Sequence, residues 1–179
     1  FLMQHYYQYF VEGETEAKMV QVLKTDFRCI CAGKVKIHNV VEKPLSRGSF
    51  TSLRFNTTAI LIFDTDTTDA TLLNENITML NSQPMIKRVL CIPQVQNLEQ
   101  ELMRSCDIHR IKELLSSKAD KDFKTDFCKC NGLRGALLKH HFDFSQFWVS
   151  TPSGAFSGIP NNISQITILT DRSGKGRSR

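Results

Sequence analysis

The stretch Tyr9-Phe10-Val11-Glu12-Gly13-Glu14-Thr15-Glu16 begins as an apolar, β-prone run and ends in carboxylates. A second run of the same kind follows later in the chain, Ala59-Ile60-Leu61-Ile62-Phe63-Asp64-Thr65-Asp66. Such runs are typical of buried strands, and each would deliver acids to the end of a sheet. The sequence therefore predicts an α/β fold in which two strands bring carboxylates together.

The spacing of these acids predicts that they converge on one small volume. Gly13 permits a tight turn from the strand into a helix over 14–26, which places Glu12 at the strand end and Glu16 one helical turn later. Asp64 and Asp66 differ by two residues, so both side chains leave the same face of an extended strand. Clustered carboxylates repel and retain protons unless a cation neutralises them, and all-oxygen ligands suit Mg²⁺ or Mn²⁺ better than zinc.

The pattern Glu12-Gly13-x-x-Glu16, followed by Asp64-x-Asp66, resembles the Toprim domain, over roughly residues 6 to 115. The spacing is most similar to that of OLD-family and RloB-like nucleases, and the small Toprim ribonucleases share the domain. The resemblance implies a parallel sheet of about four strands with helices on both faces. It also implies that the first Glu acts in acid/base chemistry or binds metal, that the Asp pair holds Mg²⁺, and that the second Glu is a further ligand.

The remaining periodicity completes the expected organisation. A strand over 85–92, closed by Pro93, should lie beside the strand over 59–64, because a helix over 69–81 connects them. We expect a Toprim-like catalytic domain over 1–117 and a helical appendage packed on it over 118–149. From Ser150 the chain is rich in Ser, Gly, Pro and Asn, which predicts a flexible tail over 150–179.

Two acids and two lysines are further candidates for the same site. The resemblance implies that Glu99, in a Leu-Glu pair after the strand over 85–92, contributes to it; Glu101 is a nearby substitute, and an acid that favours a helix start is the alternative. A lysine near the carboxylates would suit a transferring phosphate, and Lys118 or Lys124 is the candidate. The alternating charges around them are also typical of a solvated helix.

Basic residues between the acidic motifs, and aromatic residues before the first of them, are candidates for contacting a polyanionic partner. The net charge is +5 and the pI is about 8.9. Lys34, Lys36 and Arg47 form either a surface for the phosphates of a nucleic acid or an ordinary solvated face. The tyrosines at 6, 7 and 9 could stack on bases, although strand propensity explains them equally well.

The function expected from these features is Mg²⁺-dependent hydrolysis of phosphodiester bonds in RNA or DNA. Glu12 would be general base or bridging ligand, Asp64 and Asp66 would hold one metal, and Glu16 with Glu99 the other. The resemblance adds phage defence or RNA processing as a setting, and a separate ATPase as a partner, since the chain has no phosphate-binding P-loop. With no secretory or transmembrane run, we expect a cytoplasmic protein whose six cysteines are reduced. The alternative is a non-catalytic Toprim-like module that binds nucleic acid or a partner protein.

Overall fold

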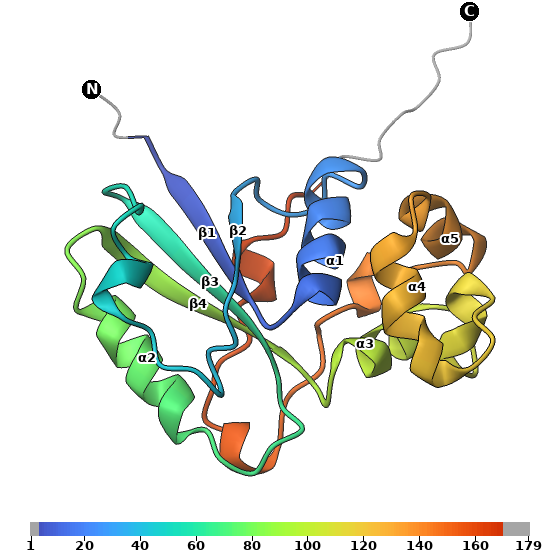
Figure 1. Cartoon of the computed structure of the whole chain (residues 1–179). Helices are drawn as coiled ribbons and strands as arrows, with labels where there is room; N and C mark the ends of the chain where they lie inside the picture. Colours follow the sequence, from blue (N-terminus) through green and yellow to red (C-terminus); the bar gives the residue numbers. More distant parts are fainter. Residues whose placement is uncertain (1–3, 170–179) are drawn as a thin grey trace, which may run out of the picture.

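The computed structural model describes residues 4–169, which form a four-stranded, wholly parallel sheet between helices. The strands are β1 (Tyr6–Val11), β2 (Lys34–Ile37), β3 (Thr57–Asp64) and β4 (Ile86–Gln94), in the order β2-β1-β3-β4 (Figure 1). The predicted α/β class and the sheet of about four strands are confirmed. β1 pairs directly with β3, so the two strands that end in acids are neighbours at the middle of the sheet.

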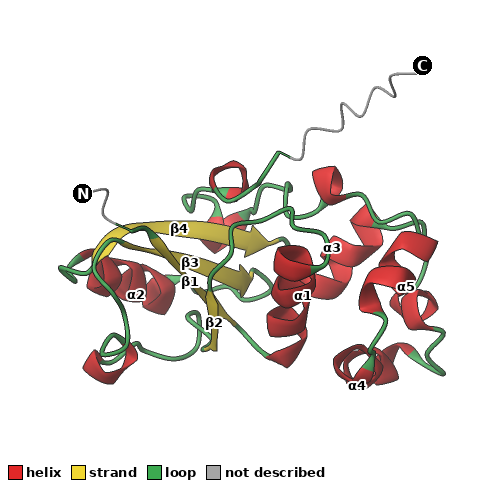
Figure 2. Ribbon diagram, turned by 90° about the horizontal axis from the view of Figure 1, so that it is seen from above, coloured by secondary structure: helices red, strands yellow, loops and turns green. Residues whose placement is uncertain are grey.

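Helices cover both faces of this sheet (Figure 2). The α-helices are α1 (Glu14–Thr25), α2 (Thr71–Asn81), α3 (Leu98–Ser105), α4 (Phe123–Lys129) and α5 (Leu133–Lys139). The connecting segments contain short 3-10 turns: η1 (Arg47–Ser49), η2 (Ile111–Leu115), η3 (Asp120–Asp122), η4 (Phe144–Gln146), η5 (Gly154–Phe156) and η6 (Ile163–Gln165). α2 packs on one face, whereas α1 and the later helices lie on the other.

The two faces have separate hydrophobic cores because side chains alternate along the central strands. Tyr9 and Ile60 point into the core under α1, while Phe10 and Leu61 point into the core under α2. All four are fully buried. Strands that are apolar on both faces explain why the sequence shows continuous hydrophobic runs instead of alternation.

The helical segment over 118–149 shares the larger core. Phe123 and Phe127 of α4 and Leu137 of α5 belong to the same cluster of buried residues as Tyr9 in β1. α1 packs directly against α4. The appendage predicted from the sequence is therefore continuous with the sheet domain in its packing.

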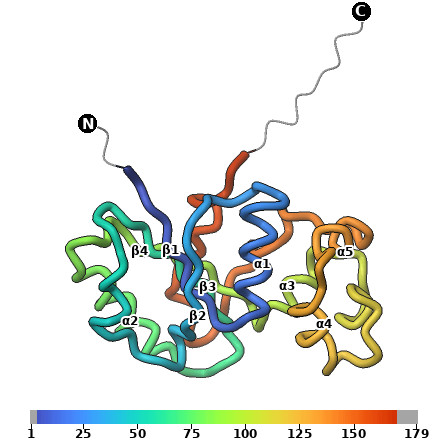
Figure 3. The backbone as a smooth tube through the Cα atoms, turned by 45° about the horizontal axis from the view of Figure 1, so that its top comes forward, coloured from blue at the N-terminus to red at the C-terminus, as the bar shows by residue number. Residues whose placement is uncertain are grey.

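Residues 150–169, called the strap below, are packed on the sheet, so the prediction of a flexible tail is wrong over this range. Phe156 is buried in the core under α2, and Ile166 is buried in the core under α1. Between them, Asn162 pairs with both main-chain groups of Cys91 at 2.8 Å, which covers the outer edge of β4. Figure 3 shows the last part of the strap (red) beside the loop that follows α1, where Thr167 bridges Ile30.

Widely spaced apolar residues and asparagines attach the strap to the sheet. Because the segment is otherwise rich in Ser, Gly and Pro, its overall composition does not reveal these anchors. The part of the predicted tail over 170–179 lies outside the described residues.

Pro93 does not end β4 as predicted. Cys91 turns its N–H and C=O towards Asn162 on the outer edge, and Pro93, two residues further, has the same orientation. Its missing N–H therefore removes no bond to β3, because β4 is an edge strand. The strand continues to Gln94, which pairs with Asp64.

Candidate active site

Glu12 and Asp64 meet at the carboxyl edge of the sheet, where ligand sites form in parallel α/β folds. Glu12 directly follows β1, and Asp64 is the last residue of the adjacent β3. The main-chain N–H of Asp64 donates a hydrogen bond to the Glu12 carboxylate. Asp64 is only 8% exposed, so it has little water to stabilise its charge.

Glu12 and Asp64 have the raised pKa values that are typical of carboxylates buried close to one another. Burial, followed by the charge of Glu12, raises the pKa of Asp64 to about 8, although a hydrogen bond from Gln94 opposes the shift. Burial also raises the pKa of Glu12, with further contributions from Glu16 and Asp66. At neutral pH the cluster therefore retains a proton or needs a cation.

Glu16 joins the cluster from the first turn of α1. It is 4% exposed, and burial raises its pKa, with a further contribution from Glu99. The turn is tight at Gly13, where an added Cβ would lie 3.2 Å from a Glu16 carboxylate oxygen. Asp66 lies beyond the end of β3 and is exposed, and its charge acts on both Glu12 and Asp64. Glu12 and Asp64 are thus each influenced by the other three acids of the two motifs.

Lys124 reaches the cluster from α4. Its ammonium group lies 3.3 Å from a carboxylate oxygen of Glu99 in α3. Although partial burial opposes it, the charges of Glu99, Glu16 and Asp64 raise the pKa of Lys124. The structure therefore brings Lys124 and Glu99 to the motif acids.

Glu101, the alternative to Glu99, has a structural role. It is fully buried, and its carboxylate accepts hydrogen bonds from the main-chain N–H groups of Val95 (2.9 Å) and Trp148 (3.0 Å). Arg104 pairs with it at 2.9 Å. These contacts fasten the turn after β4 to α3 and to the segment that precedes the strap.

The other predicted basic residues lie elsewhere. Lys118 is exposed and makes no ion pair within the described part of the chain, so nothing links it to the carboxylates. Lys34 pairs with Gln8 near the start of β1, roughly 13 Å along the strand from Glu12 at about 3.3 Å per residue. Lys36 pairs with Phe10, closer to the cluster, and Arg47 is exposed on η1.

Sequence reasoning missed the groups that hold Asp64. Gln94 donates from Nε2 to Asp64 Oδ1 at 2.5 Å, and the indole N–H of Trp148 donates to Gln94 Oε1 at 3.0 Å. Gln94 and Trp148 are both completely buried. The sequence contained one signal for Gln94: this polar residue ends the apolar run of β4, as acids end the runs of the neighbouring strands. No local pattern indicated Trp148.

The carboxylate oxygens of the cluster suit a hard divalent cation, although their side chains are not arranged in a coordination geometry. Between residues 4 and 169, no three His, Cys, Asp or Glu side chains are already arranged to hold a metal ion. The oxygens available are carboxylates, which Mg²⁺ and Mn²⁺ prefer. The raised pKa values of Asp64, Glu12 and Glu16 indicate excess negative charge that such a cation would offset.

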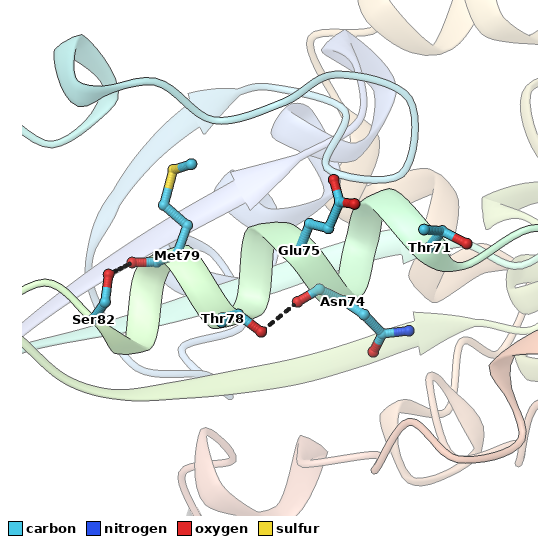
Figure 4. A pocket seen from close by; sticks show the side chains of 6 residues that line it. All are labelled: Thr71, Asn74, Glu75, Thr78, Met79 and Ser82. Carbon is cyan, nitrogen blue, oxygen red and sulfur yellow. Dashed lines mark hydrogen bonds between the residues drawn. The ribbon is translucent and has the colours of Figure 1, made fainter.

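A surface hollow along α2 is not part of this site. It has a volume of about 660 Å³ and runs along the exposed face of the helix, lined by residues from Thr71 to Ser82 (Figure 4). Two of its hydroxyl groups are occupied within the helix: Thr78 donates to the carbonyl of Asn74 at 2.9 Å, and Ser82 donates to that of Met79 at 2.7 Å. None of the cluster acids lines it.

A scan against protein-family models, a search of the curated proteins and a search of the solved structures find no match to this chain. The fold and site must therefore be interpreted from their own geometry. Over residues 4–169, no helix has the length and apolar character needed to cross a membrane.

Proposed function

We propose that this chain is a Toprim-type nuclease that uses Mg²⁺ or Mn²⁺ to hydrolyse phosphodiester bonds of RNA or DNA. The observation that carries the proposal is the meeting of Glu12 and Asp64 at the ends of two adjacent parallel strands, within one coupled group of acids. Lys124 lies beside this group. A carboxylate group with a neighbouring lysine is suited to binding a cation and a phosphate together.

Each residue has a role in this proposal. Glu12 accepts a proton from the attacking water or serves as a bridging ligand, and its hydrogen bond from the Asp64 main chain holds it in place. Asp64 and Asp66 would hold one metal ion, and Glu16 with Glu99 a second. Bound metal would supply positive charge for the phosphate and a more acidic water.

Lys124 has two possible partners, depending on the state of the site. Without substrate it pairs with Glu99. A phosphate entering the cluster would compete for the same ammonium group, which would then offset the charge that develops on the phosphate oxygens. Phage defence or RNA processing in the cytoplasm, with a separate ATPase as partner, belongs to this proposal through the Toprim resemblance alone.

A non-catalytic module that binds nucleic acid or a partner protein is the second candidate. It is favoured by the lack of a preformed metal arrangement within residues 4–169, and by the engagement of Asp64 with Gln94 and of Glu99 with Lys124. In such a module the acids would have a structural role and would not contact a substrate.

Cleavage assays with defined variants test the proposal. Purified protein is incubated with labelled tRNA, ribosomal RNA precursor, plasmid and single-stranded DNA, with and without Mg²⁺ or Mn²⁺. Glu12→Gln and Asp66→Asn should each lower metal-dependent cleavage by about 10²-fold or more while nucleic-acid binding persists. Asp69→Asn is the matched control, because Asp69 is exposed and its carboxylate accepts a hydrogen bond from the main-chain N–H of Thr71.

The same assays distinguish the second candidate. A binding module would keep full nucleic-acid affinity in Glu12→Gln, with no metal-dependent cleavage in the wild type. Neutralising Lys34, Lys36 and Arg47 together would weaken binding and reduce its salt dependence by roughly one unit of slope per lost phosphate contact. Unchanged binding by Glu12→Gln, no metal-dependent cleavage by the wild type and weakened binding by the triple variant would together exclude the nuclease.

A further inference from the structure

A second hollow lies at the opposite, amino-terminal end of the strands. It has a volume of about 370 Å³, within the range of small-molecule pockets. The first residues of β1, β2 and β3 line it, together with the loop over 52–54. Because Gln8 in its lining precedes Glu12 by four residues of β1, this hollow is separate from the carboxylate cluster.

The charge of the lining favours an anion. Lys34 and Arg54 contribute to the lining, which contains no Asp or Glu. Lys34 is exposed and makes no ion pair with any residue of 4–169. Arg54 lies over the ring of Tyr6, 5.0 Å from its centroid, and donates to the Tyr6 hydroxyl at 3.2 Å. This contact positions the guanidinium, which has five N–H donors and so keeps others for a ligand.

The side-chain amide of Gln8 offers an acceptor to a ligand with an N–H group. Gln8 is 7% exposed and lines the hollow. Its Nε2 donates to the carbonyls of Tyr9 (3.1 Å) and Lys34 (3.3 Å), but its Oε1 accepts no hydrogen bond from the residues that the structure describes. Within residues 4–169, only Ser117 Oγ is a fully buried polar side-chain atom without a partner, so Gln8 Oε1 is within reach of solvent and can accept a hydrogen bond from a donor on a bound molecule.

We infer that this hollow binds a nucleotide, with an N–H edge of the base directed to Gln8 Oε1 and the phosphate held by Lys34 and Arg54. Few small biological anions combine a flat ring bearing N–H donors with a phosphate. The stacked pair of Arg54 and Tyr6 adds a planar surface at the rim. The nucleotide is either a free mononucleotide or one unit of a nucleic-acid strand, since both present the same groups.

Titration calorimetry in EDTA tests this inference with the full chain. The probes are AMP, CMP, GMP and UMP, ribose 5-phosphate as a ligand without a base, and a single-stranded oligonucleotide. At least one mononucleotide should bind with a Kd below about 1 mM if the ligand is free. Binding of the oligonucleotide alone, with the same sensitivity to the variants below, would assign the site to a unit of a strand.

Three variants locate the binding. Arg54→Gln should weaken binding about tenfold, whereas Arg134→Gln should leave binding unchanged. Arg134 is the matched control because it also lies over an aromatic ring, 5.6 Å from the centroid of Phe27. It belongs to α5 and does not line the hollow. Gln8→Leu should weaken binding of the mononucleotide but not of ribose 5-phosphate. Lys34→Gln should show the same tenfold loss as Arg54→Gln, and these two variants carry the test if Gln8→Leu fails to fold by circular dichroism.

The inference is overturned if neither mononucleotides nor the oligonucleotide bind, or if Arg54→Gln and Lys34→Gln bind as the wild type does. EDTA removes divalent metal, and no cleavage is measured. This result is therefore independent of whether the carboxylate cluster is catalytic.

Discussion

Replacing Asp64 with asparagine should stabilise the metal-free protein, and by more at pH 8 than at pH 5. Burial and the neighbouring Glu12 raise the pKa of Asp64 from an ordinary 3.8 to about 8 in the folded state. Between these values the folded protein holds a proton that the unfolded chain has released, so folded-state stability falls as the pH rises. Asparagine does not titrate, so the variant avoids this loss.

The size of the effect follows from the two pKa values. Integrating the difference in bound protons from pH 5 to pH 8 gives about 3.5 kcal/mol, since one pKa unit corresponds to about 1.4 kcal/mol. The advantage of Asp64→Asn over the wild type should therefore grow by about 3.5 kcal/mol across this range. The asparagine can still accept the hydrogen bond that Gln94 donates, so the local packing is preserved.

Urea unfolding in EDTA at pH 5, 6, 7 and 8 measures this difference. The fluorescence of Trp148, the single tryptophan, reports on the region next to the site, and circular dichroism reports on the whole fold. Asp26→Asn, at an exposed position just after α1, is the control and should show no comparable trend. A difference that stays constant or shrinks between pH 5 and pH 8 would refute the idea that Asp64 is buried among like charges.

Three further outcomes are expected. Phe156→Ala should lower the unfolding free energy by about 3 kcal/mol in urea denaturation, because its ring is buried in the core under α2; an effect below about 0.5 kcal/mol would mean that the strap is not docked. Gly33→Ala should destabilise the protein by about 1 kcal/mol or more, since its Cβ would lie 2.6 Å from the carbonyl oxygen of Tyr7, and an unchanged melting temperature would contradict this. Lys124→Gln should slow metal-dependent cleavage by about 10²-fold, with Lys129→Gln on the same helix as control; equal rates in the two variants would remove Lys124 from the site.

The meeting of Glu12 and Asp64 could be predicted because it depends on local pattern and on parallel topology. An apolar run followed by an acid places the acid at a strand end, and a helical crossover keeps the strands parallel. Only the pairing of β1 with β3 had to be added, and the expected convergence of the acids on one small volume required it. The same logic correctly placed β4 beside β3.

The choice between Lys118 and Lys124 could not be made from the sequence. Helical spacing treats the two alike, but the chain forms the 3-10 turn η2 and then adopts a positive φ of 55° at Ser116. α4 begins only at Phe123, and its burial against α1 determines which lysine faces the acids. That packing depends on contacts between segments distant in the chain, which periodicity does not encode.

The support of Asp64 by Gln94 and Trp148 was hidden for the same reason. Trp148 lies far from both partners in sequence, and its role depends on how the chain returns to the end of β4. The strap was misjudged because its composition resembles that of an unfolded segment, whereas a few anchors such as Phe156 and Ile166 suffice to dock it.

The position of the strap has a consequence for how the protein is made. All four strands are synthesised before Asn162 exists, so a growing chain on the ribosome presents the outer edge of β4 without its cover. An uncovered strand edge can pair with other chains, which makes this interval vulnerable to aggregation. Trp148, which orients Gln94 beside Asp64, is also synthesised after all four strands. The carboxylate cluster therefore reaches its final geometry only after the strands of the sheet have been synthesised.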